Sequence, residues 1–493
     1  MSEHFDVVVI GAGLSGIGAA YHLQTMCPDR TYVILEGRQN LGGTWDLFRY
    51  PGVRSDSDMH TLGYRFKPWT EAKSIADGPA ILAYLRETAK ENGIDGHIRF
   101  GCLASRAEWS SVDARWSVHT VDKNTEQDSV FTCNYLFMCS GYYSYKKGFT
   151  PEFVGVESFE GTIVHPQKWP ADLAYEDKNV VVIGSGATAM TLVPAMTSTA
   201  RHVTMLQRSP TYVVSRPDHD PVADKLRKFL PAKLAYRLTR LKNTTMQQIV
   251  YKKTRTEPEK VKAQLLGLVR AELGPDYDVD THFTPSYNPW DQRLCLVPNS
   301  DLFRAIRKGR ASVVTDQIQN FTPTGIQLAS GQHLEADIIV TATGLQMVTL
   351  GEMEFVVDGQ LVDFAKTWTY KGCSYSGVPN MASSFGYINA SWTLRSDLTC
   401  EYVCRLLNHM KKTRTLQCTP QLRQEDHAMT PRSWIDGFSS GYMERTMHLM
   451  PRQGDHAPWI NPQNYGADKK MFRKAPIEDG VMLFTAPEVV LRS

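Results

Sequence analysis

The stretch that decides the fold is Phe5-Asp-Val-Val-Val-Ile-Gly-Ala-Gly-Leu-Ser-Gly16. Its first six residues are rich in β-branched side chains and predict a buried strand, and the amphipathic run from Ile17 to Thr25 predicts a helix. Gly11, Gly13 and Gly16 follow the G-x-G-x-x-G spacing. Residues without Cβ let the backbone approach a pyrophosphate, and the N-terminus of the following helix supplies free N–H groups and the positive end of a dipole. The stretch therefore predicts a dinucleotide-binding unit.

The strand that follows this helix predicts which dinucleotide is bound. Tyr32 to Leu35 forms a second apolar run that ends in Glu36, 20 residues beyond Gly16. A carboxylate at this place accepts hydrogen bonds from ribose hydroxyls and repels a 2′-phosphate. The first unit is therefore expected to hold FAD or NAD, and not NADP.

The same order of strand, glycine turn, helix and strand returns later in the chain, from Asn179 to Leu206, and indicates an internal duplication. Its ribose-reading position holds Gln207 and Arg208 in place of an acid. Arginine favours a 2′-phosphate because its planar donors form bidentate hydrogen bonds, worth roughly 1.5 to 3 kcal/mol; the alternative is a solvated surface arginine. The second unit is predicted to bind NADPH through Gly184, Ser185, Gly186, Ala187, Thr188, Ala189, Gln207 and Arg208.

The composition fits a protein of several domains. The chain has 493 residues, 42% of them hydrophobic and 22% charged, and this length predicts about three domains with cores of their own. Its 54 Lys and Arg nearly balance 52 Asp and Glu, which leaves a net charge of +2. So small a net charge gives no large field for phosphate backbones, and nucleic acid is not expected as a partner.

The cysteines and the N-terminus indicate the compartment. The nine cysteines are scattered and form no C-x-x-C pair, so neither a disulfide framework nor a metal site is expected, and a reducing environment fits best. Met1 to Phe5 lacks the pattern of a signal peptide, and no run approaches about 18 apolar residues. We expect a cytoplasmic protein with at most peripheral contact with a membrane.

A basic, helix-like segment from Val222 to Leu273 follows the second unit. Between Asp224 and Lys262 it holds 12 Lys and Arg against 3 Asp and Glu. An apolar stripe on this segment could contact an anionic membrane, but we expect it to pack into the core of a solvated helical insertion. The stripe consists of Leu226, Phe229, Leu230, Leu234 and Leu238.

Two long motifs resemble a known family. The flavin-side signature of Baeyer-Villiger monooxygenases resembles the stretch Gly42-Gly-Thr-Trp-Asp-Leu-Phe-Arg-Tyr-Pro-Gly-Val-Arg-Ser-Asp56. Their fingerprint, which stands between the two nucleotide units, matches Phe159-Glu-Gly-Thr-Ile-Val-His-Pro-Gln-Lys-Trp-Pro170. The run from Tyr287 to Leu294 looks most similar to the branch of ethionamide-activating monooxygenases.

The resemblance implies an α/β fold with two dinucleotide-binding Rossmann-like domains, one for FAD and one for NADPH, and a helical insertion. The FAD domain is expected to comprise residues 1–145 and 345–493. The NADPH domain is expected to comprise residues 150–215 and 291–344, with the helical insertion at 216–290.

The resemblance also implies the chemistry. In the family, NADPH reduces FAD, O2 adds to the flavin as a C4a-peroxide, and its anion attacks a ketone to give an ester or lactone. A guanidinium suits the stabilisation of such anions because it stays charged without releasing its proton. The family's arginine falls on Arg293, and the Asp that holds it falls on Asp56. Asp58 is the alternative partner, and a loop pair between Arg293 and Asp291 is the alternative role.

The family's pattern places further residues. The contacts with FAD are expected from Gly11, Gly13, Ser15, Gly16, Glu36, Gly43, Thr44, Trp45, Asp46, Leu47 and Asp56, with Ala104 beside the adenine end. His165 and Trp169 of the fingerprint are expected at the hinge between the nucleotide domains. Thr343 and Gly344 mark the second crossing between these domains.

Other functions remain open at this point. An N- or S-hydroxylating flavin-containing monooxygenase shares the fold but generally lacks Trp at the position of Trp169 and does not need Arg293. A flavin redox sensor that oxygenates nothing is an alternative from another class. Disulfide reductases are disfavoured because Gly42-Gly-Thr-Trp45 stands where their cysteine pair is required. The expected partners are O2 and a small ketone, with sulfides or thioamides as further substrates for S-oxygenation.

We predict that Arg208→Gln narrows the preference for NADPH over NADH by about tenfold in kcat/KM, because the variant loses a charge-assisted contact with the 2′-phosphate. Steady-state kinetics with both nucleotides measures the ratio. An unchanged ratio would remove Arg208 from the nucleotide site.

Overall fold

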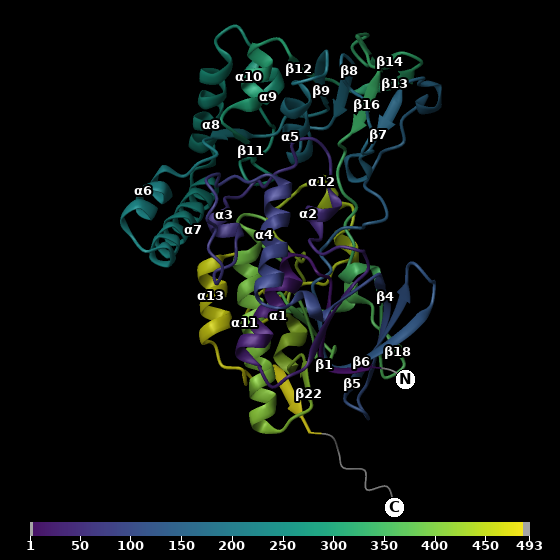
Figure 1. The fold of residues 1–493 in the computed structure, drawn as a ribbon, viewed down its shortest axis with the longest axis vertical. Helices are drawn as coiled ribbons and strands as arrows, with labels where there is room; N and C mark the ends of the chain where they lie inside the picture. The colour runs from purple at the N-terminus through teal and green to yellow at the C-terminus, as the bar shows by residue number, and fades with distance from the viewer. Residues whose placement is uncertain (1–2, 487–493) are drawn as a thin grey trace, which may run out of the picture.

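The computed structural model describes residues 3–486, whose two largest β-sheets lie with their helices at opposite ends of an elongated molecule (Figure 1). Residues 1–2 and 487–493 of the expected FAD domain lie outside this range. The first sheet has the strand order β18 (Gln360–Leu361), β17 (Glu354–Val357), β4 (Cys102–Ser110), β5 (Arg115–Asp122), β6 (Asp128–Met138), β1 (Glu3–Ile10), β2 (Tyr32–Glu36) and β3 (Ile98–Phe100), and β21 (Met381–Ser383) also pairs with β6.

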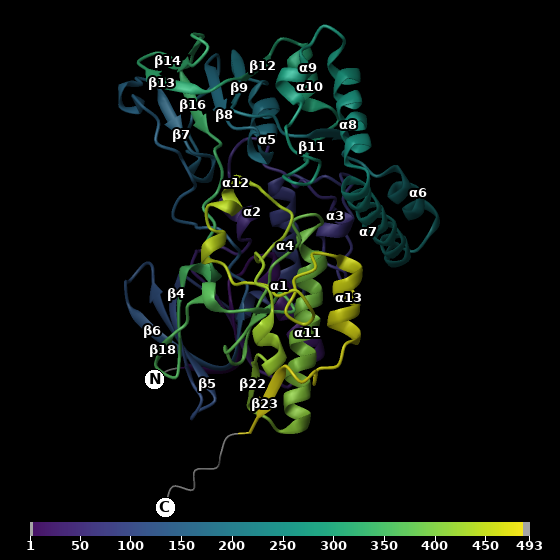
Figure 2. The same ribbon diagram turned by 180° about the vertical axis from the view of Figure 1, so that it is seen from behind.

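The second half of strand β1, from Val7 to Ile10, is continuously apolar and buried because both faces of the sheet are covered there. Val7 and Val9 point to the core shared with the helices α1 (Leu14–Met26), α4 (Gly78–Glu91) and α11 (Trp392–Thr413). Val8 and Ile10 point to the other core, against the antiparallel β4–β5–β6 meander. Figure 2 shows α1 and α11 side by side with α13 (Tyr465–Lys474). Strand β1 lies between β6 and β2 and is parallel to both, as in a dinucleotide-binding unit.

The second sheet has five strands, all parallel: β12 (Ala311–Thr315), β9 (His202–Gln207), β8 (Asn179–Ile183), β16 (Ile338–Thr341) and β7 (Thr162–Val164). Helices α5 (Ala187–Met196) and α10 (Asp301–Arg307) cover one face. The small sheet of β13 (Ile318–Thr322), β14 (Gly325–Leu328) and β15 (His333–Glu335) covers the other.

Two crossovers join the sheets and are hydrogen-bonded to each other. The first follows β6 and the second follows β16. The amide of Phe149 donates to the carbonyl of Gly344, and the hydroxyl of Thr343 donates to the carbonyl of Phe149 at 2.6 Å. Farther along, the amide of Ser144 donates to the carbonyl of Gln346. The two crossovers therefore lie side by side, and each contacts one of the two glycine turns.

The segment between β10 (Val213–Arg216) and β11 (Cys295–Pro298) is helical. It forms α6 (Pro221–Phe229), α7 (Ala232–Thr256), α8 (Pro258–Leu273) and α9 (Val279–Phe283), of which α6 and α7 project from the side of the molecule (Figure 1). Arg240 fixes the buried side of α7. Its Nη1 donates to the carbonyls of His60, Thr61 and Gly63, and its Nη2 lies 3.8 Å from Asp397.

The expectation that the apolar stripe of this segment packs into a core was wrong. Phe229 is 76% exposed, Leu234 44% and Leu238 39%, while Leu226 and Leu230 are partly buried. The buried side of α7 is instead made of small, aromatic and polar side chains that pack on α3 (Met59–Leu62). The stripe therefore faces outward.

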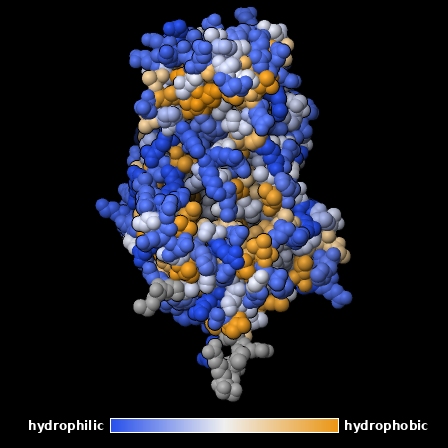
Figure 3. Space-filling view, turned by 90° about the vertical axis from the view of Figure 1, so that its right-hand side faces the viewer, coloured by the Kyte–Doolittle hydropathy of each residue, from blue (hydrophilic) through white to orange (hydrophobic). Residues whose placement is uncertain are grey.

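The remaining elements are short. They are α2 (Thr44–Leu47), α12 (Gly441–Glu444), β19 (Thr369–Tyr370), β20 (Ser374–Tyr375), β22 (Gln417–Pro420) and β23 (Met482–Thr485). On the side of the molecule away from α6 and α7, apolar residues lie in groups separated by hydrophilic ones (Figure 3). Among the described residues, no helix has the length and apolar character needed to cross a bilayer.

We predict that Arg240→Gln destabilises the protein by roughly 3 kcal/mol, because it leaves Asp397 and buried carbonyls without their cationic partner. Urea unfolding followed by circular dichroism measures this change. Arg237→Gln, one turn away at an exposed position, is the matched control and should change stability by less than about 0.5 kcal/mol. Equal effects of the two substitutions would contradict the anchoring role of Arg240.

Candidate active site

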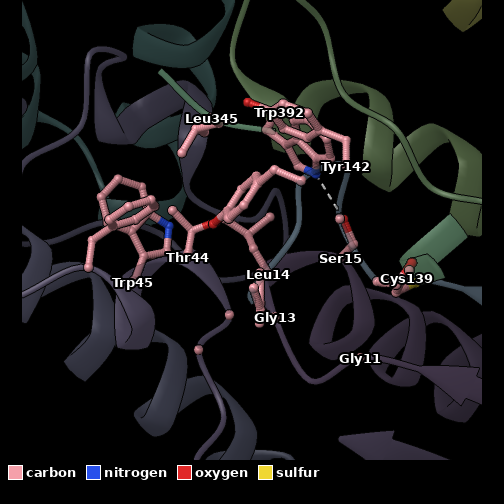
Figure 4. Close-up of a pocket in the computed structure, with 18 of the residues that line it drawn as sticks. Gly11, Gly13, Leu14, Ser15, Thr44, Trp45, Cys139, Tyr142, Leu345 and Trp392 are labelled. Atoms are coloured by element: carbon pink, nitrogen blue, oxygen red, sulfur yellow. Dashed lines mark hydrogen bonds between the residues drawn. The ribbon is translucent and has the colours of Figure 1, made fainter. Parts of the chain in front are cut away.

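A cavity of about 470 Å³ opens between the two sheets, where the glycine turn of the first unit meets residues of the second. This volume lies in the range of small-molecule sites. Figure 4 shows Thr44 and Trp45 on one side of it and Tyr142 and Trp392 on the other, with Ser15 next to Trp392. Of the residues predicted for the site, the cavity is lined by Gly11, Gly13, Ser15, Glu36, Gly43, Thr44, Trp45, Asp56, Ala104, Ala187 and Arg293.

The glycine turn has the shape that a pyrophosphate requires. Gly11 has φ +102°, and a Cβ there would lie 2.7 Å from the carbonyl oxygen of Cys139. A Cβ on Gly16, which does not line the cavity, would lie 1.9 Å from the carbonyl oxygen of Gly11 and would push α1 away from the turn. Gly13 begins α1 without any side-chain cap, so the first N–H groups of the helix stay available to an anion. The residues present therefore fit a dinucleotide phosphate.

Glu36 lies at the end of β2 and is 5% exposed. Its carboxylate accepts from the amide of Ala12 at 2.8 Å and from the amide of Arg38 at 2.9 Å. Burial raises the pKa of this carboxyl above its ordinary value, against the effect of both amides. The side chain thus ties the strand tip to the glycine turn and reaches the cavity wall, as the ribose-reading role predicts.

The flavin-side signature wraps around the turn. Gly43 has φ +54° and packs against Gly13, and the hydroxyls of Thr44 and Tyr143 lie 2.6 Å apart. Asp46 points away from the cavity and forms ion pairs with Arg38 and Arg49 at 2.6 and 2.8 Å. Leu47 also lies outside the cavity lining, so the contacts of these two residues with FAD stay predictions.

Arg293 and Asp56 meet across the cavity. The Nη1 of Arg293, just before β11, lies 3.5 Å from the carboxylate of Asp56, and both side chains are about one-third exposed. Burial disfavours the charged form of the guanidinium and would lower its pKa. The charge of Asp56, together with Tyr442 and Tyr142, has a larger opposite effect, so the pKa of Arg293 lies above its ordinary value. The cation is therefore permanent, and it faces the space in front of the glycine turn.

The structure also separates the alternatives for this pair. Asp58 caps α3, accepting from the amide of Thr61, and receives hydrogen bonds from Asn243 and Gln247 of α7. Asp291 pairs with Arg255 at 2.5 Å. Neither acid is engaged by Arg293.

The second glycine turn lies at the tip of β8. Gly184 has φ +137°, and a Cβ there would lie 2.4 Å from the carbonyl oxygen of Ala342, while Gly186 is open to space. Helix α5 begins at Gly186 without a side-chain cap, which again leaves N–H groups for an anion. The hydroxyl of Ser185 donates to the carbonyl of Ser209 and lies 3.0 Å from the hydroxyl of Thr211, so the turn is held to the segment that follows β9.

Gln207 and Arg208 differ in their surroundings. The amide nitrogen of Gln207 is occupied by the carbonyl of His282 and the hydroxyl of Thr315, which directs this side chain into the protein. Arg208 is exposed and pairs with no acid among residues 3–486. Of the two, the structure leaves Arg208 available to a ligand. Both contacts with the nucleotide stay predictions, as do those of Thr188 and Ala189.

His165 lies against both crossovers. Its ring packs on Gly148, its Nδ1 accepts a hydrogen bond from the amide of Gln167 at 3.1 Å, and burial lowers its pKa. Trp169 packs with the core of the second sheet beside Tyr50 of the flavin-side signature. These contacts lie where the expected hinge role places them.

Sequence reasoning missed the aromatic wall of the cavity. Tyr142 stacks on Trp392 with ring centroids 5.3 Å apart, and the indole nitrogen of Trp392 donates to the hydroxyl of Ser15 at 2.9 Å (Figure 4). Tyr442 comes from α12, and burial together with the neighbouring Tyr142 raises its pKa, against the effect of Arg293. Of these aromatic residues, only Tyr142 has a place in the sequence that could have indicated the site, because it directly follows the turn at Gly141.

Two family models match the chain. One is described as an NAD(P)-binding Rossmann-like domain and matches residues 9–75. The other is described as flavin-binding monooxygenase-like and matches residues 72–259.

Known relatives cover nearly all of the sequence. The FAD-containing monooxygenase EthA of Mycobacterium tuberculosis (strain ATCC 25618 / H37Rv) is 52% identical over 485 residues, which are 98% of each chain. The probable FAD-binding monooxygenase AlmA of Acinetobacter baylyi is 48% identical and covers 98% of this chain and 97% of its own. The chain belongs to the family of FAD-containing monooxygenases. The predictions of a flavoprotein monooxygenase, with FAD and a nicotinamide dinucleotide as cofactors, are confirmed.

Solved structures share the fold of this flavoprotein monooxygenase. An oxidized steroid monooxygenase bound to NADP has a TM-score of 0.79 at 22% identity and covers 98% of this chain and 100% of its own. Cyclohexanone monooxygenase from Rhodococcus sp. Phi1 bound to NADP+ has a TM-score of 0.75 at 19% identity, covering 99% and 100%. The predicted α/β fold with two dinucleotide-binding units is confirmed, and so is the resemblance to Baeyer-Villiger monooxygenases.

We predict that Asp56→Asn lowers kcat for oxygenated product by about tenfold, because Arg293 loses the charge that holds it at the cavity. Asp58→Asn is the matched control, since asparagine caps a helix about as well as aspartate, and kcat should change by less than about threefold. Product formation is measured by gas chromatography. A larger loss in Asp58→Asn than in Asp56→Asn would reverse the assignment.

Proposed function

We propose that this chain is a Baeyer-Villiger monooxygenase, which converts ketones, NADPH and O2 to esters or lactones, NADP+ and water, and which also S-oxygenates sulfides or thioamides. The observation that supports the proposal most is the Arg293–Asp56 pair inside the cavity that begins at the glycine turn. A disulfide reductase or electron carrier has no need of a fixed cation there.

The proposed division of the chain follows its two sheets. Residues 1–145 and 345–493 form the FAD domain, residues 150–215 and 291–344 the NADPH domain, and residues 216–290 the insertion. The FAD site uses the turn from Gly11 to Gly16, with Glu36 at the ribose. The NADPH site uses Gly184 to Ala189, with Arg208 at the 2′-phosphate.

Bound FAD, once reduced by NADPH, supplies the chemistry that activates O2. The task of Arg293 is to stabilise negative oxygen in front of the glycine turn. Its guanidinium suits this task because the raised pKa keeps the proton on nitrogen, so the cation donates hydrogen bonds without acting as an acid. Asp56 orients the guanidinium from the opposite wall of the cavity.

The aromatic wall covers part of this cation, whose side chain is about one-third exposed. Tyr142 and Trp392 belong to an apolar cluster with Phe385, Trp434 and Tyr442, contributed by three separate segments of the chain. A dry surrounding strengthens every electrostatic interaction of the guanidinium. The same apolar lining supports a hydrophobic ketone or sulfide as the substrate.

We predict that the FAD of the Arg293→Ala variant is still reduced by NADPH at a rate within about twofold of the wild type, because hydride transfer does not need the cation. The variant should form less than about 1% of the oxygenated product that the wild type forms, because stabilisation of the anionic oxygen does need it. Stopped-flow absorbance measures the reduction, and chromatography with a peroxide assay measures the fate of O2. Arg255→Ala, which removes an exposed arginine nearby, should keep product formation. Normal ester formation by Arg293→Ala would contradict the proposal.

A further inference from the structure

The outer face of α6 and α7 carries an exposed apolar stripe that the site described above does not use. Besides Phe229, Leu234 and Leu238, Leu241 is 63% exposed and Ile249 44% exposed. On α7 these residues follow one another at intervals of four, three and eight, which places them on one helical face. Large apolar side chains gathered on one exposed face mark a contact surface.

Unpaired cations flank this stripe. Helix α7 contains seven Lys and Arg and no Asp or Glu. Among the described residues, no acid pairs with a group of six exposed cations on the two helices, although Arg227, Lys242 and Arg255 are paired. The unpaired cations are Lys225, Lys228, Lys233, Arg237, Lys252 and Lys253. An apolar centre with basic flanks is the pattern of a helix that lies in a lipid–water interface.

The opposite side of α7 is fixed to the first domain. Arg240 is buried among three carbonyls of the segment from His60 to Gly63, and Asn243 and Gln247 donate to Asp58. The apolar face is therefore held outward on a rigid support and needs no rearrangement to contact a flat surface. Its projection from the side of the molecule leaves it accessible (Figures 1 and 2).

We propose that the outer face of α6 and α7 docks the protein on a bilayer of anionic lipid. Charge complementarity favours this occupant, because the unpaired lysines and arginines gain from negative headgroups while the apolar stripe enters the boundary of the acyl chains. A second copy of the chain would bring the same cations against each other.

Docking through this face brings the membrane near the cavity without covering the nucleotide turns. Helix α7 packs on α3, whose Leu62 lines the cavity wall. Helices α7 and α3 thus lie between the bilayer and the site. A hydrophobic substrate dissolved in lipid then lies close to the enzyme that consumes it.

The test is flotation of the FAD-loaded protein with vesicles. We expect about tenfold more protein to float with vesicles of roughly 70% phosphatidylcholine and 30% phosphatidylglycerol than with pure phosphatidylcholine, and about 0.5 M salt to abolish the difference. Failure to float with the anionic vesicles overturns the proposal.

Variants assign the binding to this face. The triple variant Leu234→Gln, Leu238→Gln, Leu241→Gln should float about fivefold less, and so should Lys228→Gln combined with Lys233→Gln and Arg237→Gln. The control, Val112→Gln with Leu361→Gln, replaces even more exposed apolar residues elsewhere and should float like the wild type. Equal loss in the control overturns the assignment.

Two measurements without vesicles show whether the variants are folded and whether a second copy of the chain occupies this face. Each variant should keep its FAD absorbance and its rate of NADPH oxidation without vesicles. Light scattering should give the same mass for wild type and triple variant. A dimer that dissociates in the triple variant, with no flotation of the wild type, would assign the face to a second copy instead.

Discussion

The ion pair between Arg293 and Asp56 is the interaction on which the rest of this structure depends. Asp56 closes the loop that wraps the first glycine turn, and Arg293 precedes the strand by which the chain returns to the second sheet. The pair therefore bridges two halves of the molecule at the cavity between them. Arg54 and Asp301 form a second bridge, 2.5 Å long, from the same loop to α10. Both halves must be in place for the guanidinium to face the cavity.

Both nucleotide turns are built by the same physical constraint. At Gly11 and at Gly184, the chain leaves the buried end of a strand with positive φ, and a side chain there would collide with a carbonyl of the neighbouring crossover. Those two crossovers are hydrogen-bonded to each other, so the turns share one support. The close packing that excludes a Cβ is also what lets a phosphate approach the helix N-termini.

The repeating units could be predicted from the sequence because their signals are local. Strand β2 spans the expected apolar run from Tyr32 to Leu35 together with Glu36, since a strand covered on both faces reads as a continuous apolar run. The family motif placed Asp56 opposite Arg293, although Asp58 lies only two residues away. The aromatic wall could not be predicted: Tyr442 and Trp392 come from segments that meet only through tertiary packing, and neither carries a periodic pattern.

The stripe on α7 was assigned to the wrong environment for a physical reason. Amphipathic spacing shows that apolar residues share a face, but it does not show which face is covered. Here the covered face is held by Arg240 and by small residues such as Ala235 and Thr239, which hydropathy does not mark as core. The apolar face is left to the outside.

The most direct test of the account is product analysis under isotopically labelled O2. The purified enzyme with FAD is incubated with NADPH and a panel of hydrophobic ketones, and the products are identified by mass spectrometry. The account predicts esters or lactones with a single labelled oxygen beside the carbonyl. Recovery of unchanged ketone, with the consumed O2 returned entirely as hydrogen peroxide, would contradict it.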